Sequence, residues 1–232
     1  MKKKLVILTG AGISAESGIP TFRDAITGLW ENTSIEEVCI EGCLERNEEK
    51  AYRFYADLHD KYKDCKPNQA HIDLVGLEKD YDVTIITQNV DNLHEQAGST
   101  NVIHLHGELN KVRALDDPSL LWDWDDSIIM HEDTVIDGHH IRPHIVMFGE
   151  DVPNITKAQH IMSDADICVV IGTSFNVYPA AGLVGFVRYD KPIYYIDPKP
   201  AYTPDYPNIQ VIKATATEGV KELISKLKEN GN

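Results

Sequence analysis

Unbroken apolar runs alternate with amphipathic stretches along most of this 232-residue chain. The runs predict strands at 5–8, 83–87, 102–105, 167–171 and 193–196, with a shorter candidate at 211–212. Between them, helical periodicity predicts helices around 49–63, 69–79, 157–163, 180–187 and 218–228. This alternation is typical of an α/β fold with a doubly wound, parallel, Rossmann-like sheet.

Two segments interrupt the alternation. Residues 31–80 form a helical insertion, and residues 107–141 are irregular, acidic and rich in tryptophan and histidine. We expect both to build a smaller lobe over the carboxyl ends of the strands, where ligands bind in open α/β sheets. The predicted division gives 1–30, 81–106 and 143–232 to the Rossmann-like domain, and 31–80 with 107–142 to the smaller lobe.

Composition and charge narrow the possible partners. The net charge of −15 argues against nucleic-acid and anionic-membrane partners, which need basic surface, and permits lysine-bearing protein segments. No apolar run is long enough for a membrane span, and the first run is too short for a signal peptide, so we expect a cytoplasmic protein. The four cysteines lack the spacing of a disulfide framework or a zinc ribbon, which favours packing roles.

The residues after the first apolar run, 9–23, read TGAGISAESGIPTFR. Gly10 and Gly12 allow a tight turn and close approach to a pyrophosphate, and Ala15 occupies the position of a third small residue. Amides of the turn and of the helix expected after it would face the phosphates. A bare Gly-x-Gly-x-x-Ala also occurs where a turn merely joins a strand to a helix, so the pattern alone leaves both interpretations open.

The usual dehydrogenase signature is incomplete here. Such enzymes have a second strand that ends in a ribose-binding acid about twenty residues after the turn. In this chain residues 28–33 read GLWENT, with no β-branched run before them. The sequence therefore disfavours hydride transfer and predicts a nucleotide site used for another reaction.

Further motifs follow in order along the chain. They are TQNVDNLH at 87–94, HG at 106–107, RPHIVMFGE at 142–150, and GTS at 172–174 leading into VYPAA at 177–181. Together with the first loop, these motifs closely resemble those of the sirtuin family, nearest to its bacterial deacylase type. The resemblance extends from residue 5 to about residue 227.

The resemblance implies an NAD-consuming protein lysine deacylase that releases nicotinamide and O-acyl-ADP-ribose. It makes His106 the general base, a role suited to a side chain that titrates near neutral pH, and assigns Asn89 and Asp91 to the nicotinamide carboxamide. The carboxylate of Asp197 can accept hydrogen bonds from the ribose hydroxyls and would repel a 2′-phosphate, so we expect NAD rather than NADP. The remaining implied NAD contacts are Gly10, Ala11, Gly12, Ala15, Phe22, Arg23, Gln88, Gly172, Thr173, Ser174 and Ala216.

The acylated peptide is expected to bind as an added strand between residues 148–150 and 176–178, mainly through its backbone. The implied substrate-binding residues are Tyr55, Val146, Phe148, Gly149, Glu150, Asn176 and Val177.

The chain departs from the family in its expected metal module. Most sirtuins bind zinc through four cysteines in this region, whereas residues 107–141 contain none, so we expect no metal. We expect an apolar plug instead, made of Trp122, Trp124, Leu120, Leu121, Ile128 and Ile129. The disfavoured alternative is a replacement metal site drawn from His131, His139, His140, His144, Asp133 and Asp137.

A second departure concerns the acyl group. Succinyl-removing relatives carry a Tyr-x-x-Arg pair, and here Tyr55 is followed by Leu58 at the arginine position, with Arg53 turned away by helix geometry. Without a guanidinium the site lacks a bidentate carboxylate contact, so we expect neutral acyl groups to be preferred.

Three activities remain open for the nucleotide site: deacylation, ADP-ribosyl transfer or NAD hydrolysis, and non-catalytic sensing. His106 together with the peptide edge at 148–150 favours deacylation.

Overall fold

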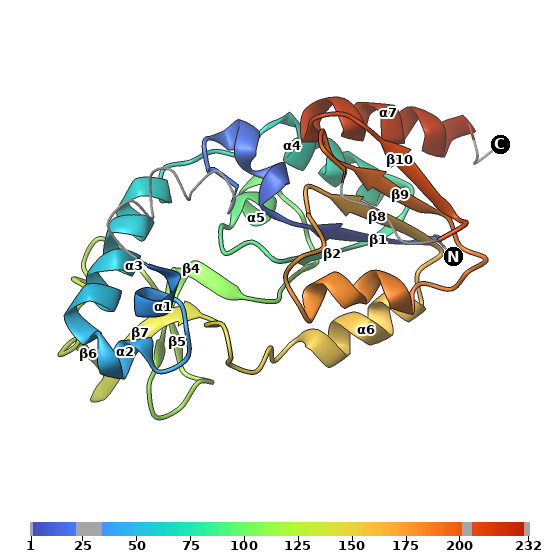
Figure 1. Cartoon of the computed structure of the whole chain (residues 1–232). Helices are drawn as coiled ribbons and strands as arrows, with labels where there is room; N and C mark the ends of the chain where they lie inside the picture. Colours follow the sequence, from blue (N-terminus) through green and yellow to red (C-terminus); the bar gives the residue numbers. More distant parts are fainter. Residues whose placement is uncertain (1, 22–33, 201–205, 230–232) are drawn as a thin grey trace.

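The computed structural model describes residues 2–21, 34–200 and 206–229. In this part of the chain six strands form a parallel sheet in the order β10-β9-β8-β1-β2-β3 (Figure 1). They are β1 Lys4–Thr9, β2 Asp82–Thr87, β3 Val102–His104, β8 Ile167–Ile171, β9 Ile193–Ile196 and β10 Ile209–Ile212. The predicted doubly wound α/β fold is confirmed.

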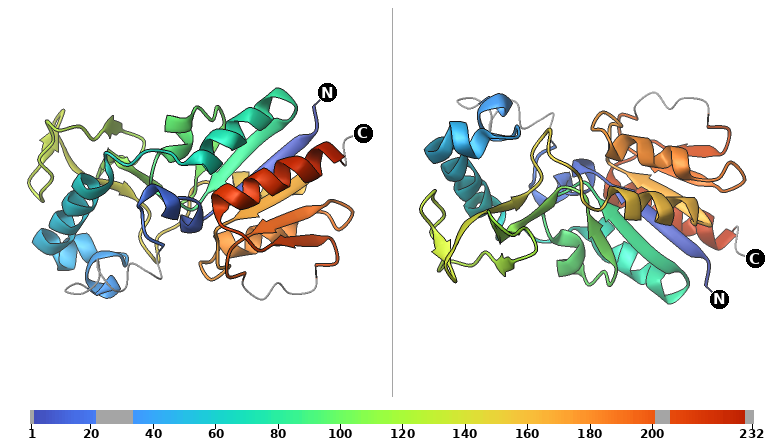
Figure 2. Two further views of the ribbon diagram at one scale, coloured as in Figure 1. Left: turned by 90° about the horizontal axis from the view of Figure 1, so that it is seen from above. Right: turned by 90° about the horizontal axis from the view of Figure 1, so that it is seen from below.

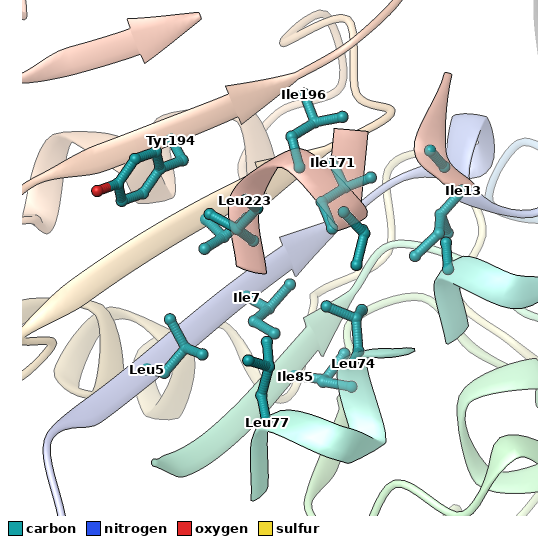
Figure 3. Close-up of a cluster of buried hydrophobic side chains, with 14 of the residues drawn as sticks. Leu5, Ile7, Ile13, Leu74, Leu77, Ile85, Ile171, Tyr194, Ile196 and Leu223 are labelled. Carbon is teal, nitrogen blue, oxygen red and sulfur yellow. The ribbon is translucent and has the colours of Figure 1, made fainter. Parts of the chain in front are cut away.

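Helices cover both faces of this sheet. One face carries α4 Gln69–Gly76, the short 3₁₀ turn η4 Leu77–Lys79 and α7 Ala216–Glu229, and the other carries α6 Ile155–Ser163 and η5 Ala180–Phe186. Side chains alternate between the faces along β1, so Leu5 and Ile7 join one core while Val6 and Leu8 join the other. Figure 3 shows the first core, in which Leu74 and Leu223 from the helices meet the strands. Each such buried side chain contributes about 1.5–3 kcal/mol.

The strand order reverses between β1 and β8. These strands are hydrogen-bonded neighbours, but the chain continues from β1 toward β2 and from β8 toward β9, on opposite sides. The connections that follow β1 and β8 therefore run toward opposite sides of the sheet, and we expect the ligand crevice at the carboxyl edge, where the two begin. Open α/β sheets bind ligands at this switch point.

A smaller lobe lies beside the parallel sheet (Figure 2). Its antiparallel sheet has the order β5-β4-β7-β6, with β4 Gly107–Ala114, β5 Leu121–Asp123, β6 Val135–Ile136 and β7 His139–Ile145. In the described part of the lobe the helices are α1 Ile35–Val38, α2 Cys43–Arg46 and α3 Glu48–Tyr62. Buried side chains of the helices and strands form a separate core.

The prediction that residues 107–141 are irregular is wrong, because much of this segment is sheet. Two features hide the strands in the sequence. Pro143 lies inside β7, where a proline normally argues against a strand, and a register shift between Gly107 and Val112 interrupts the alternation in β4.

Three smaller expectations also need correction. Residues 11–17 form the 3₁₀ turns η1 Ala11–Ile13 and η2 Ala15–Ser17 where an α-helix was expected, and residues 180–186 are 3₁₀ as well. Helix α4 packs against the parallel sheet through Ala70 and Leu74, so by its contacts it belongs to the larger domain. The rest of the predicted domain division stays a prediction.

Across the described ranges, no helix combines the length and the apolar character that crossing a bilayer requires.

Candidate active site

The loops after β1 and β8 meet backbone to backbone. The Gly10 amide donates to Ile171 O at 3.0 Å, and the Gly12 amide donates to Gly172 O at 2.9 Å. A Cβ added to Gly12 would lie 2.5 Å from the Gly172 Cα, and Gly172 itself has φ +62°. The glycines are therefore required by the contact between the two loops, a reason that the nucleotide motif alone did not reveal.

The end of β2 supplies a second wall of the crevice. Asn89 Nδ2 donates to Ser14 Oγ at 3.1 Å, and Ser14 Oγ donates to Asp91 Oδ2 at 2.9 Å. The Leu93 amide holds the other carboxylate oxygen of Asp91 at 3.2 Å. Burial raises the pKa of Asp91, and the hydrogen bonds from Leu93 and Ser14 oppose that shift. Ser14, fully buried, is thus a site residue that sequence reasoning did not single out.

His106 lies where the chain leaves the parallel sheet for the smaller lobe, between β3 and β4. Its Nδ1 is 2.9 Å from Gln88 O. A carbonyl oxygen only accepts, so Nδ1 carries the proton and Nε2 keeps its lone pair. Burial lowers the pKa of His106, with an opposing contribution from the bond to Gln88. The ring is therefore a neutral base at pH 7.

Gln88 connects this base to the β8 loop. Its backbone amide donates to Thr9 O at 2.9 Å, and its Nε2 donates to Thr173 Oγ1 at 3.2 Å. The structure thus brings His106, Gln88 and Thr173 together with the Asn89–Ser14–Asp91 network at one edge of the sheet.

Other predicted cofactor residues border the same edge. Asp197 follows β9, and its Oδ1 accepts from the Lys199 amide at 2.7 Å. Ala216 begins α7 and is buried. Ala11, half-buried, and Ala15, exposed, belong to the 3₁₀ turns, and Ser174 is half-buried beside Thr173. Phe22 and Arg23 lie outside the described residues.

Glu16 fastens the first loop to α7. Its carboxylate accepts from the Thr217 amide at 3.0 Å, from Thr217 Oγ1 at 2.7 Å and from Thr215 Oγ1 at 3.3 Å. Desolvation opposes ionisation, but these bonds prevail and lower the pKa of Glu16. A carboxylate at the start of a helix is also favoured by the helix dipole.

The expected peptide edge is partly occupied. The Phe148 amide donates to Cys39 O, and the Glu41 amide donates to Phe148 O, both at 2.8 Å. Both backbone groups of Phe148 are therefore engaged within the chain, although its side chain is 43% exposed. The Gly149 amide has no acceptor among the described residues. It is therefore the group of this loop that could donate a hydrogen bond to the backbone of a bound peptide.

Glu150 holds the loop in place. Its carboxylate accepts from Arg142 Nη1 at 2.6 Å, from the Met147 amide at 2.9 Å and from Arg113 Nη2 at 3.5 Å. Burial opposes ionisation of Glu150, and the bond from Arg142 contributes most to the net lowering of its pKa. Because these partners engage the carboxylate and the Glu150 amide donates to Met147 O at 3.1 Å, the carbonyl oxygen of Glu150 is the group that remains a candidate for peptide binding.

Tyr55 lies in the core of the smaller lobe. Its Oη donates to Met147 Sδ at 3.2 Å and lies 3.4 Å from Cys39 Sγ. Leu58 is half-buried one turn later, while Arg53 points outward and pairs with Glu49 at 2.6 Å. Among the other predicted substrate residues, Val146 and Val177 are half-buried and Asn176 is exposed.

Trp124 anchors the region where an apolar plug was expected. It is buried, and its ring stacks on His59 with 4.4 Å between centroids. Trp122 and Ile128 pack against the same core, but Leu121 and Ile129 are exposed, so the predicted plug is wrong in those two members. Met130 is buried instead.

The alternative metal ligands are not gathered. His139 Nδ1 lies 2.9 Å from Asp116 Oδ1, and His131 Nδ1 accepts from the Asp133 amide. Within residues 2–21, 34–200 and 206–229, no group of three or more His, Cys, Asp or Glu side chains is arranged to hold a metal ion.

Two buried histidines lie beside the strand ends that carry the site. Thr9 Oγ1 donates to Thr87 Oγ1 at 2.8 Å and lies 3.1 Å from His94 Nε2. The His94 ring meets His71 edge-on at 4.9 Å, and both side chains are fully buried. Burial lowers the pKa of His71 to about 4 and that of His94 well below its ordinary value. Both rings are therefore neutral in the folded protein.

The chain is similar to known proteins over most of its length. A model of the Sir2 family matches residues 10–179. A protein of Aggregatibacter actinomycetemcomitans named NAD-dependent protein deacylase is 51% identical over 201 residues, which are 86% of this chain and 95% of that protein. One of the same name from Helicobacter pylori (strain ATCC 700392 / 26695) is 47% identical, covering 98% of both chains.

Solved structures agree with this similarity. A structure described as a Sir2 homolog–NAD complex has a TM-score of 0.85 and 37% identity, covering 99% of this chain and 91% of the other. The ADP-ribose complex of a mutant Sir2 homologue has a TM-score of 0.86, also with 37% identity, covering 99% of this chain and 93% of the other.

We predict that His71 makes the protein less stable in mild acid. Its pKa is about 4 when folded against 6.5 when exposed, so the unfolded chain binds the proton first, and stability is lost as pH falls from 6.5 toward 4. The loss between pH 7 and pH 5 is about 2 kcal/mol from this residue. Urea unfolding at the two pH values should show a smaller difference for His71→Gln than for the wild type.

Glutamine preserves an acceptor for the Asn68 amide at this helix start, which makes it a suitable replacement. The exposed His160→Gln variant should keep the wild-type pH dependence. An unchanged pH dependence in His71→Gln would contradict the assignment of a neutral, buried His71.

Proposed function

This chain belongs to the Sir2 family, and from that premise we propose that it removes acyl groups from protein lysines with consumption of NAD. NAD-dependent protein deacylation is the activity named for relatives that are 47% to 51% identical. The observation that carries the proposal is His106, a neutral base fixed by Gln88 in the same crevice as the Asn89–Ser14–Asp91 network.

Several features of this sheet edge suit a dinucleotide. The two loops present glycine backbone there, and a Cβ at Gly10 would lie 2.7 Å from Gly172 O. Thr173 and Ser174 offer hydroxyls at the end of β8, and Asp197 offers a carboxylate at the end of β9. We propose that phosphates lie against the two loops and the adenosine ribose against Asp197.

Bound NAD supplies a glycosidic bond whose cleavage releases nicotinamide. Asn89 and Asp91, held by Ser14, are suited to orient the carboxamide by hydrogen bonds. His106 Nε2 is available to accept a proton from a ribose hydroxyl, while Gln88 O keeps the ring oriented. The low polarity implied by the burial of His106 and Asp91 strengthens these contacts.

One observation supports a second candidate function, ADP-ribosyl transfer or NAD hydrolysis. Residues 39–41 occupy the backbone of Phe148, which shortens the edge offered to a peptide. ADP-ribosyl transfer to a protein, or hydrolysis of NAD, uses the same crevice without needing that edge.

We predict that His106→Ala lowers deacylation by about 100-fold or more, since general-base catalysis typically contributes a factor of that size. NAD binding should stay close to that of the wild type, because His106 contributes a proton acceptor and not the main binding contacts. The measurement follows nicotinamide and O-acyl-ADP-ribose together with acylated peptides, alongside a titration with NAD. His160→Ala, an exposed histidine on α6, is the matched control.

The same assay separates the candidates. Nicotinamide release without peptide identifies a hydrolase, and labelled protein identifies a transferase. Wild-type deacylation by His106→Ala would defeat the proposed role of the imidazole.

We also propose that neutral acyl groups are preferred. Leu58 offers no charge to an acyl carboxylate, and the hydroxyl of Tyr55 is already bonded to Met147. We predict that kcat/KM is at least about tenfold higher for acetyl-lysine than for succinyl-lysine peptides, in line with the loss of one charged contact. Leu58→Arg should narrow that ratio, whereas removal of the outward guanidinium in Arg53→Leu should leave it unchanged. Preference of the wild-type protein for succinyl-lysine is the contrary result.

We further propose that the smaller lobe is stable without zinc. The support is the core in which Trp124 and Met130 are buried beside Val112 and Ile141. We predict far less than one zinc per chain by elemental analysis of purified protein, and a melting temperature unaffected by a chelator. Stoichiometric zinc would contradict this proposal.

A further inference from the structure

An apolar groove with an acidic rim lies on the smaller lobe, at β5, β6 and the segment between them. Its volume is about 490 Å³, and Trp122, Ile128, Ile129 and Ile136 line it together with Asp123 and Asp125. Ile129 is 78% exposed. Figure 1 draws β6 at the end of this lobe that lies away from the parallel sheet, so the groove is separate from the NAD crevice.

The segment that lines the groove carries charge of one sign. Residues 115–141 contain eight aspartates and glutamates and no lysine or arginine. The basic residues nearest to this segment have acidic partners. Lys63, directly after α3, pairs with Asp126 at 2.6 Å. Lys111 and Arg113 of the neighbouring strand β4 pair with Glu108 at 3.0 Å and with Glu150 at 3.5 Å. A surface of this kind attracts cationic partners and repels nucleic acids, anionic lipids and a symmetric copy of itself.

The groove is connected to the catalytic side of the lobe by one strand. β6 pairs with β7, and β7 runs directly into residues 146–150, which we place beside the acylated lysine. The seven residues of β7 span roughly 20–25 Å at about 3.3 Å per residue. A substrate chain held at both places therefore bridges a distance of roughly 20–30 Å, which about 8–10 extended residues cover.

We infer that this groove is a second docking site for the protein substrate, and that it binds a lysine-rich amphipathic segment some distance along the chain from the acylated lysine. Apolar side chains of the segment enter between Trp122 and Ile129, and its unmodified lysines meet Asp123 and Asp125. Docking there raises the effective concentration of the acylated lysine at the crevice. This inference rests on the proposed function, because it takes acylated proteins as the substrates.

Direct binding tests the groove without any catalysis. The probe is a fluorescein-labelled, unacylated peptide of about 14 lysines and leucines at helical spacing, with a glutamate–leucine peptide of equal length as its counterpart. Fluorescence anisotropy should show binding of the lysine peptide only, weakening as KCl rises from about 50 to about 500 mM. Ile129→Ser and the double variant Asp123→Asn with Asp125→Asn should each weaken binding by about fivefold or more.

Two matched controls lie on the parallel-sheet domain. Val211→Ser removes an exposed apolar side chain from β10, and Glu218→Gln removes an exposed charge from α7. Both should bind the lysine peptide as the wild type does. Equal binding by wild type and groove variants would overturn the inference, since attraction by the overall net charge would then explain it.

Kinetics supply the second readout. For an acetyl-lysine peptide extended by the lysine–leucine segment through a linker of about ten residues, Ile129→Ser should raise KM about fivefold and leave kcat unchanged. A short acetyl-lysine peptide should be turned over equally by both proteins. Turnover of the short peptide without any advantage for the long one would overturn docking while the proposed function stands.

Failure of both peptides to react would contradict the proposed function, and the anisotropy result would still decide whether the groove binds. Sedimentation provides the last check, because a dimer that Ile129→Ser dissociates would show that a second copy of the chain covers the groove.

Discussion

The contact between Gly12 and Gly172 is the constraint on which the site depends. It joins the loops after β1 and β8 where the order of the parallel strands reverses, and it leaves no room for a Cβ on either residue. Each loop then carries its polar groups to one edge of the sheet: Ser14 from the first, Thr173 from the second. We infer that this backbone contact, together with the polar side chains that the loops carry, shapes the proposed dinucleotide site.

Burial sets the protonation states around this crevice. His106 and the more deeply buried His71 and His94 all lose basicity through desolvation, while Asp91 becomes a weaker acid. A neutral imidazole with Nδ1 tied to a carbonyl is a proton acceptor at Nε2, so the same burial that stabilises the fold also prepares the base. On the smaller lobe, Glu150 is also partly buried but stays ionised, because Arg113 and Arg142 both pair with its carboxylate.

The sequence predicted the parallel sheet well because strands buried on both faces leave continuous apolar runs, as in β8 and β9. It failed for the antiparallel sheet, where Pro143 and a register shift interrupt the alternation. The sequence also predicted that the motif residues Asn89, Asp91 and His106 lie near one another, because each stands at or soon after the end of a predicted strand. Ser14 and the pairing of Phe148 with residues 39–41 depend on contacts between distant segments, which no local pattern records.

The most direct measurement is a calorimetric titration of NAD into Gly172→Ala, with Gly76→Ala as the control because a Cβ at Gly76 meets nothing within 4 Å. At Gly172 the added Cβ would lie 2.6 Å from the backbone of Gly12 and would force the two loops apart. We expect a folded Gly172→Ala protein whose NAD affinity falls by about tenfold or more, and a control that binds as the wild type does. Wild-type NAD affinity in Gly172→Ala would contradict the claim that this contact builds the cofactor site.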